Sequence, residues 1–148
     1  MILVKYFIAP SQIFKAGKGL FLEEECPKGK VLIIPNEIQC LVSEKEIFQN
    51  EHLEASSIRW FEDVFSVDHE WSAESHLNHS FTPNCYWHLG FVFAARNLKK
   101  KEELTVDYSL FLGEGRESDF YDSLTQKKVI GLSWKESLKT SLQNLLSL

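Results

Sequence analysis

The stretch SHLNHSFTPNC, residues 75–85, is a dense run of turn-forming and hydrogen-bonding side chains closed near its end by a proline. Pro83 disfavours helical backbone at the preceding residue, so Thr82 is expected to be extended. A second stretch, EELTVDY at residues 102–108, has the composition of a short strand and ends on a tyrosine. The first stretch is too polar for a core and too rich in special residues for a simple connection. The two stretches are therefore the candidate centre of the molecule.

A third stretch, KAGKGLF at residues 15–21, places two glycines upstream of the other two. Taken in this order, the three stretches resemble the Gly-x-Gly, Asn-His-Ser and Glu-Glu-Leu-Thr-x-x-Tyr motifs of SET-domain lysine methyltransferases. The resemblance implies a mainly β (α+β) fold of the SET β-clip type, in which the later two segments cross in a pseudoknot. Several short sheets, a helical insert and C-terminal helices complete it. The implied organisation is a SET domain over residues 1–112, with a helical extension over residues 113–148 packed on the same domain.

The resemblance also implies roles for individual residues. Lys18, Gly19, Asn78, His79 and Tyr108 would contact the cofactor S-adenosyl-L-methionine, and Tyr108 would be the catalytic residue. Each also has an ordinary explanation: a glycine turn, a structural histidine in a capped loop, and a tyrosine that packs at a strand end. Glycines are informative because the missing Cβ lets the backbone approach a ligand closely. The order of the motifs along the chain favours the cofactor site.

The reaction explains which other side chains to expect. A free lysine has a pKa of about 10.4, and methyl transfer requires its neutral form, which burial in an apolar channel favours. Aromatic walls would attract the methylated cation. The resemblance implies that Tyr86, Trp87 and Phe111 line the substrate channel, although core packing explains any single aromatic residue equally well. The cysteine-rich zinc-binding segment of many members is absent, so the C-terminal helices are expected to complete the wall. Further aromatic candidates are Phe120, Tyr121 and Trp134.

Length and charge narrow the class of partner. The 148 residues fit one domain with a core of its own. Sixteen basic and twenty-one acidic residues give a net charge of −5. This balance argues against nonspecific nucleic-acid binding and suits a positively charged protein substrate. The apolar run in residues 1–10 is too short for a signal peptide or a membrane span, so no membrane association is expected.

The cysteines and histidines indicate neither a disulfide framework nor a metal site. Cys26, Cys40 and Cys85 form no CxxC pair and are odd in number, which indicates free thiols in a reducing compartment and predicts a cytoplasmic protein. His76, His79 and Cys85 offer metal-ligating groups within one loop, but their spacing matches no zinc pattern that we recognise. We therefore expect no metal.

Glycine and proline punctuation predicts a β-rich body. A hairpin is expected within residues 86–95 with its turn at Gly90. Residues 58–67 fit both helical and strand periodicity, and we favour strands. Residues 72–75 are expected to begin a short helical turn. Further strands are expected at residues 4–9, 20–22, 31–34 and 104–108.

Capping boxes and apolar spacing predict three helices. The SEKE motif at residues 43–46 can start a helix that runs to about residue 54. Residues 118–128 carry apolar side chains at helical spacing, and the SWKE motif at residues 133–136 is a second capping box. The last helix is expected to pack an apolar face on the body or on a partner. That face consists of Leu138, Leu142, Leu145 and Leu146.

The hypothesis is an S-adenosylmethionine-dependent methyltransferase that acts on a lysine side chain of a protein. The alternative from another class is a catalytically inactive SET-fold module for protein–protein contacts, with the leucine-faced C-terminal segment as its docking element. A metal-dependent hydrolase that uses the histidines has no ligand spacing to support it. The C-terminal helices also offer a contact surface for a homodimer.

Overall fold

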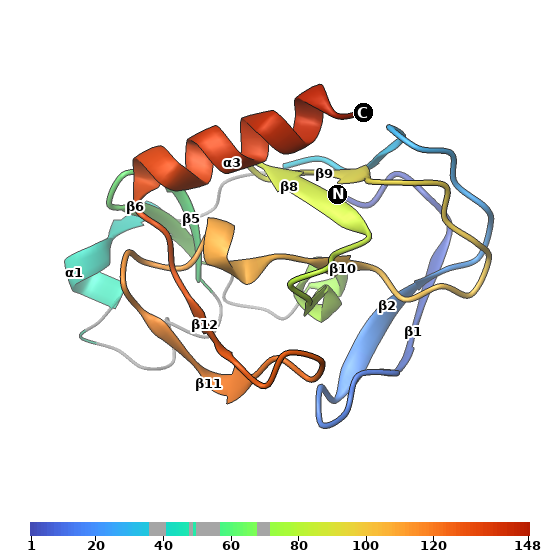
Figure 1. Cartoon of the computed structure of the whole chain (residues 1–148), viewed down its shortest axis with the longest axis horizontal. Helices are drawn as coiled ribbons and strands as arrows, with labels where there is room; N and C mark the ends of the chain where they lie inside the picture. The colour runs from blue at the N-terminus through green and yellow to red at the C-terminus, as the bar shows by residue number, and fades with distance from the viewer. Residues whose placement is uncertain (36–40, 48, 50–56, 68–71) are drawn as a thin grey trace.

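The computed structural model describes residues 1–35, 41–47, 49, 57–67 and 72–148. In these residues the chain forms five small sheets, and one long helix lies across the top of Figure 1. The expected mainly β architecture of several short sheets is confirmed. The helical segments are α1 (Glu44–Ile47), η1 (Ala73–His76), η2 (Tyr108–Leu110) and α3 (Trp134–Leu146). The strands are β1 (Tyr6–Pro10), β2 (Lys18–Leu22), β3 (Val31–Ile33), β4 (Leu41–Ser43), β5 (Ser57–Phe61), β6 (Val64–Val67), β7 (Asn78–His79), β8 (Cys85–His88), β9 (Phe91–Ala94), β10 (Thr105–Val106), β11 (Glu117–Tyr121) and β12 (Lys128–Ile130).

The main core lies between the β1–β2 hairpin and the antiparallel sheet β3–β9–β8. Four of the five residues of β2 are buried, as its continuous apolar sequence indicates, and Leu20 and Leu32 are fully buried. The predicted hairpin at Gly90 is confirmed as the β8–β9 connection. Leu89 (φ 49°) and Gly90 (φ 80°) both have left-handed backbone, as a tight two-residue hairpin turn requires.

The helical insert is a second, smaller unit built on the sheet β4–β6–β5. Strands are confirmed over residues 58–67, where the sequence was ambiguous. The helix that the SEKE motif predicts begins as α1, and both the hydroxyl and the backbone N–H of Ser43 donate to the Glu46 carboxylate (2.7 and 2.8 Å). The rest of that predicted helix, to residue 54, falls almost wholly on residues outside those described.

Residues 118–128, which we predicted to be helical, instead belong to the antiparallel hairpin β11–β12. The turn chemistry explains the difference, because the Thr125 backbone N–H donates to the Asp122 carboxylate (2.7 Å) and Asp122 N–H donates to the Lys127 carbonyl (2.8 Å). Gln126 has left-handed backbone (φ 56°), which ends any helix. The side chains that suggested an apolar helix face are mostly exposed: Phe120, Tyr121 and Leu124.

The last predicted helix is present as α3 and starts with its predicted capping box. Ser133 Oγ accepts from the Glu136 backbone N–H (3.3 Å), and the Glu136 carboxylate accepts from the Ser133 backbone N–H (3.3 Å). The helix lies over β8 and η2, so residues beyond 113 pack on the same body as the motif segments.

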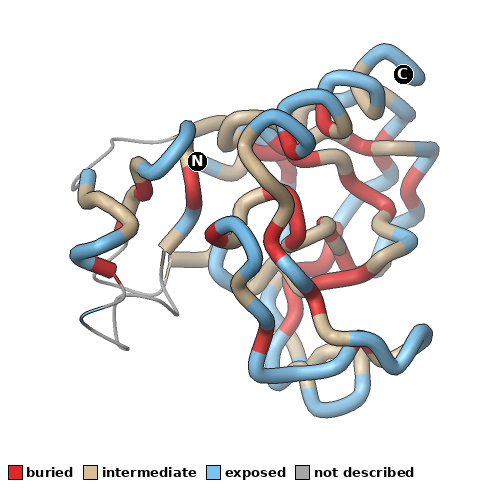
Figure 2. Tube along the Cα trace, turned by 60° about the vertical axis from the view of Figure 1, so that its left-hand side comes forward, coloured by how far each residue is buried: buried red, intermediate tan, exposed pale blue. Residues whose placement is uncertain are grey.

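The inward face of α3 is polar, contrary to the expectation from its sequence. Ser137 is fully buried and donates to the Leu110 carbonyl, and Ser141 Oγ lies 2.9 Å from His88 Nδ1. In Figure 2 the outer turns of this helix are exposed. The body therefore does not bury most of the leucine face. The exposed fractions are 37% for Leu138, 48% for Leu142 and 80% for Leu146.

Two of the three cysteines lie in the described part of the structure. Cys26 and Cys85 are buried free thiols, and burial raises the pKa of both. Cys40 lies outside the described residues. None of the helices in the described parts of the chain has the length and apolar character needed to cross a membrane.

Candidate functional site

The two later motif segments lie side by side as the parallel strands β7 and β10. Asn78 is in register with Thr105, and His79 is in register with Val106. The Ser80 backbone N–H continues the contact by donating to the Val106 carbonyl (3.0 Å). Because β10 leads within two residues into η2, this pairing brings the tyrosine of one motif next to the histidine of the other.

Tyr108 is held through both its backbone and its side chain. Its backbone N–H donates to His79 Nδ1 (3.1 Å), and its hydroxyl donates to the Leu77 carbonyl. Burial raises the pKa of the phenol to about 12. The hydroxyl is therefore protonated at neutral pH, so it can orient a neighbouring group by hydrogen bonding but cannot serve as a base.

His79 is buried and has one nitrogen without a hydrogen-bond partner. Because Tyr108 N–H donates to Nδ1, the ring proton is assigned to Nε2. Nε2 makes no hydrogen bond, and the Asp122 carboxylate is 4.0 Å from it. Burial lowers the pKa of His79 and outweighs the opposing effect of Asp107 and Asp122. The neutral imidazole packs among aromatic rings, with centroid distances of 4.5 Å to Phe81, 5.4 Å to Tyr108 and 6.0 Å to Phe120.

Asn78 connects the Gly-x-Gly segment to the other two motifs. Its amide Nδ2 contacts the Lys18 carbonyl (3.0 Å), Glu103 Oε1 (2.8 Å) and Ser11 Oγ (3.2 Å). The Glu103 carboxylate also accepts from the Ser11 hydroxyl (2.7 Å) and the Gln12 backbone N–H (2.7 Å). Glu103 is only 6% exposed, so its several donors compensate the cost of burying a charged group. One carboxylate thus fixes three separate chain segments.

The two glycines have different surroundings. A Cβ at Gly19 would lie 2.7 Å from Glu103 Cδ and nearer still to Oε1. Gly19 is therefore required by a close approach within the protein. Gly17 has left-handed backbone (φ 71°), and a Cβ there would have no atom within 4 Å. The backbone on that side of Gly17 is uncovered, as a ligand-facing glycine would be.

The aromatic residues expected in the substrate channel do not all lie together. Phe111 packs between Tyr108 and Trp87, with ring-centroid distances of 5.1 and 5.4 Å. Trp87 is only 4% exposed and belongs to the main core. Tyr86 precedes it in β8 and so points to the opposite face of the sheet. Phe120, from the β11–β12 hairpin, meets Tyr108 edge to face at 6.0 Å.

Two site residues were missed from sequence. Glu103 stood inside the second motif, where its position next to Glu102 gave no indication of which carboxylate would be buried. Asp122 stood in a segment predicted to be helical, so its approach to His79 could not be foreseen. In the described part of the chain, no three or more His, Cys, Asp and Glu side chains are grouped as metal ligands.

Comparison with known proteins bears on this arrangement. The family model of the SET domain matches residues 17–109, from the first glycine of the Gly-x-Gly segment to the residue after Tyr108. None of the curated proteins compared with the chain matches it. The matched residues make up more than half of the 148 and contain the Gly-x-Gly pair and both later motifs, so the chain belongs to the SET-domain family.

Proposed function

We propose that this protein is an S-adenosylmethionine-dependent methyltransferase that acts on a lysine side chain of a protein. SET domains are generally lysine methyltransferases. The observation that carries the proposal is that adjacent residues of β7 contact both other motifs: Asn78 donates to the Lys18 carbonyl, and His79 accepts from the Tyr108 backbone N–H. Residues from three distant segments meet there, and they are the residues that the motifs single out.

The uncovered backbone at Gly17 would accommodate the amino-acid end of the cofactor. No atom lies within 4 Å of a Cβ position at this residue, and the Lys18 carbonyl and the Asn78 amide lie beside it. No hydrogen bond among the described residues uses Asn78 Oδ1, which leaves that oxygen as an acceptor for an ammonium group. When bound, S-adenosylmethionine supplies a methyl group on a positively charged sulfur.

The residues around Tyr108 would prepare the lysine for attack. The rings of Phe111 and Phe120 surround the phenol, and an apolar environment favours the neutral amine over the ammonium ion. The Tyr108 hydroxyl is fixed by the Leu77 carbonyl and would orient the amine nitrogen through its oxygen. Neither Tyr108 nor His79 has an atom available to accept a proton. The substrate lysine would therefore lose its proton to water before water is excluded from the site.

One observation favours the non-catalytic alternative. The leucine face of α3 is left exposed by the body, with Leu146 at 80%. Exposed apolar surface of this kind is typical of a protein–protein contact. A docking module and an enzyme differ in whether the segment around Gly17 and Asn78 binds the cofactor. The buried free thiols Cys26 and Cys85 favour the cytoplasm as the location for either.

Calorimetry with S-adenosylmethionine tests the proposal, with Asn78→Ala as the site variant. Asn78 holds both the Lys18 carbonyl and Glu103, so thermal melting of the variant must first establish that it is folded. We expect binding by the wild type and a marked loss in the folded variant. A transfer assay with radiolabelled cofactor and lysine-rich proteins then detects the reaction. If the wild-type protein binds no S-adenosylmethionine, the proposal that it is a methyltransferase is refuted.

A further inference from the structure

The β11–β12 hairpin brings two side chains to the Tyr108 site, although it follows the residues that the family model matches. The Phe120 ring centroid lies 6.0 Å from that of Tyr108 and 6.0 Å from that of His79. Asp122 stands where β11 ends, and its carboxylate Oδ2 is 4.0 Å from His79 Nε2. The hairpin therefore adds an aromatic ring and a negative charge to a site built from the motifs.

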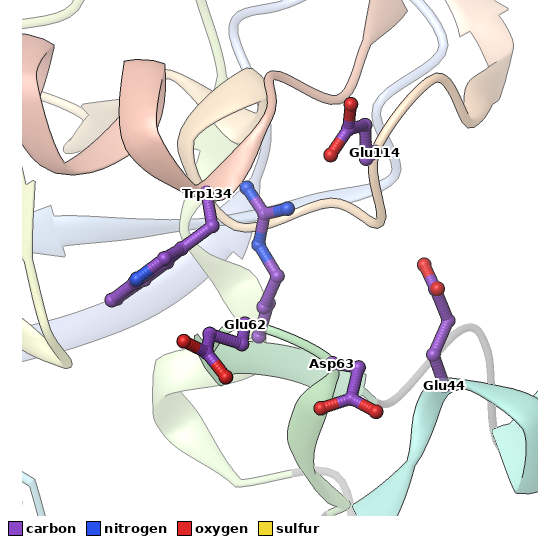
Figure 3. Close-up of a pocket in the computed structure, with 6 residues that line it drawn as sticks. Glu44, Glu62, Asp63, Glu114 and Trp134 are labelled. Carbon is purple, nitrogen blue, oxygen red and sulfur yellow. The ribbon is translucent and has the colours of Figure 1, made fainter.

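The base of this hairpin is fixed to the body, whereas its tip is exposed. Beyond β12, the Leu132 backbone N–H donates to the Ser109 carbonyl (2.9 Å), and the Leu132 carbonyl accepts from the buried Arg59 guanidinium (2.8 Å). Arg59 also lines the hollow of Figure 3, together with Trp134 at the start of α3. At the tip, Leu124 is 75% exposed. A small movement of the tip would therefore leave the contacts at the base intact.

His79 and Asp122 are one contact short of a continuous chain of hydrogen bonds to Tyr108. Because the Tyr108 backbone N–H donates to Nδ1 (3.1 Å), the ring proton of His79 is on Nε2. Nε2 is buried and has no hydrogen-bond partner among the described residues. A buried donor without a partner is costly. A movement of about 1 Å that brings Asp122 Oδ2 within hydrogen-bond distance would remove that cost.

Asp122 is suited to this contact because it is an ionised acceptor held at a fixed place. It is only 4% exposed, and its Oδ1 accepts from the Thr125 backbone N–H (2.7 Å). Burial raises the pKa of Asp122, but the hydrogen bonds from Thr125 outweigh this effect, so the pKa is lowered. A second carboxylate, that of Asp107, lies 3.9 Å from His79 Nδ1. Asp107 is therefore on the side that Tyr108 N–H already occupies, and Nε2 is left to Asp122.

We propose that Asp122 is a positioning residue for methyl transfer: it accepts from His79 Nε2–H when the hairpin tip closes, and it thereby holds the imidazole in the tautomer that fixes Tyr108. With the proton on Nε2, Nδ1 stays an acceptor for Tyr108 N–H, and the phenol keeps its contacts with the Leu77 carbonyl and the Phe111 ring. In the other tautomer, two N–H groups would face each other at Nδ1. The inference rests on the proposed function for the reaction itself, whereas the tautomer of His79 is measurable without it.

Asp122→Asn separates this role from the role of Asp122 in the turn. Asparagine keeps one oxygen for the Thr125 backbone N–H, but it places an amide N–H opposite Nε2, which favours moving the ring proton to Nδ1. Asp122→Glu keeps a carboxylate on a longer stem and should preserve the wild-type tautomer. The matched control is Asp119→Asn, which removes the same charge from an exposed position of the same strand. Thermal melting establishes that each variant is folded.

The first measurement is ¹⁵N NMR of the histidine ring nitrogens. Protonated and unprotonated nitrogens of a neutral imidazole have different chemical shifts, and the spectrum of His79→Gln identifies the signals of His79. We expect Nε2–H in the wild type, in Asp122→Glu and in the control, and a shift towards Nδ1–H in Asp122→Asn. In a radiolabelled transfer assay, kcat of Asp122→Asn should fall about 10- to 100-fold, as is common when the partner of a site histidine is lost. The KM for the cofactor should change much less, and Asp122→Glu should recover part of the rate.

Unchanged ring-nitrogen shifts in Asp122→Asn would overturn the proposal. So would a full transfer rate in a variant whose tautomer has changed, or an equal loss of rate in Asp119→Asn. If the wild type transfers no methyl group to any protein while the tautomer still follows residue 122, the methyltransferase proposal fails and the link from Asp122 to His79 stands.

Discussion

Substituting Gly19 by alanine tests whether Glu103 organises the site as the structure indicates. The new Cβ would lie 2.7 Å from Glu103 Cδ, which is closer than real Cβ atoms come, and 3.1 Å from Cγ, which is tighter than most Cβ contacts. A flexible surface glutamate could swing away at little cost. Glu103 is 6% exposed and accepts from Ser11, Gln12 and Asn78, so it cannot move without losing hydrogen bonds.

The loss of stability in Gly19→Ala follows from the hydrogen bonds that Glu103 accepts. Ser11 Oγ and Asn78 Nδ2 both donate to Oε1, the atom nearest the new methyl group. A hydrogen bond to a charged group contributes about 1.5–3 kcal/mol, and partial relaxation recovers some of it. We expect Gly19→Ala to lower the free energy of unfolding by about 2–4 kcal/mol. For a chain of this length that corresponds to a melting temperature lower by about 5–15 °C.

Thermal and urea denaturation measure this loss, with Gly17→Ala as the matched control. Gly17 has left-handed backbone but open space around it, so an alanine there should cost only about 1 kcal/mol. In a Glu103→Ala background the methyl group at position 19 meets no carboxylate, and its added cost should fall below that of the control. If Gly19→Ala is no less stable than Gly17→Ala, Glu103 does not occupy the space behind this glycine and the reasoning is wrong.

Three further outcomes are expected. Tyr108→Phe should abolish or strongly reduce methyl transfer while cofactor affinity measured by calorimetry stays nearly unchanged, because only a hydroxyl is lost; equal transfer rates would make Tyr108 a packing residue. Burial lowers the pKa of His79, so below about pH 6.5 the unfolded chain takes up a proton that the folded state resists, and stability should fall on acidification by at most about 1.4 kcal/mol per pH unit. Melting curves of wild type and His79→Gln between neutral and mildly acidic pH should show the shallower dependence in the variant, and identical slopes would contradict it. Ser137→Ala should cost about 1–3 kcal/mol because a buried carbonyl loses its donor, whereas Leu142→Gln should change melting little, with sedimentation reporting whether this leucine meets a second copy.

Local patterns in the sequence predict most strands and two of the helix starts. Glycine and proline punctuation found the β8–β9 hairpin because its turn needs positive φ at Leu89 and Gly90. The pairing of β7 with β10 is different, since Asn78 and Thr105 are far apart in sequence and each strand has only two residues. No periodicity can be read from so short a strand. Its placement was available only through the resemblance of the motifs to a known family.

The site depends on contacts of the same non-local kind. Asn78, His79 and Tyr108 were predicted as site residues because their motifs are distinctive. Glu103 and Asp122 were not, because their importance lies in burial, and burial is decided by the chain that packs over them. Asp122 reaches His79 only because residues 118–128 form a hairpin. Asp122 accepts a hydrogen bond from the Thr125 backbone N–H and so stabilises a turn. This turn outweighs the helix that the apolar spacing of the segment predicts.

In helix α3, the residues that predict a helix are not the residues that form its buried face. Its leucine spacing located a helix correctly, but the face that packs on β8 is the one with serines. Small side chains let a helix approach a sheet closely, and the two hydroxyls meet polar partners, the Leu110 carbonyl and His88 Nδ1. Leucines at those positions would fill the space but leave both partners unsatisfied, at a cost of about 1–3 kcal/mol each. The inward face is therefore selected by the polar groups beneath it, and three of the four leucines are left exposed, while Leu145 is half-buried.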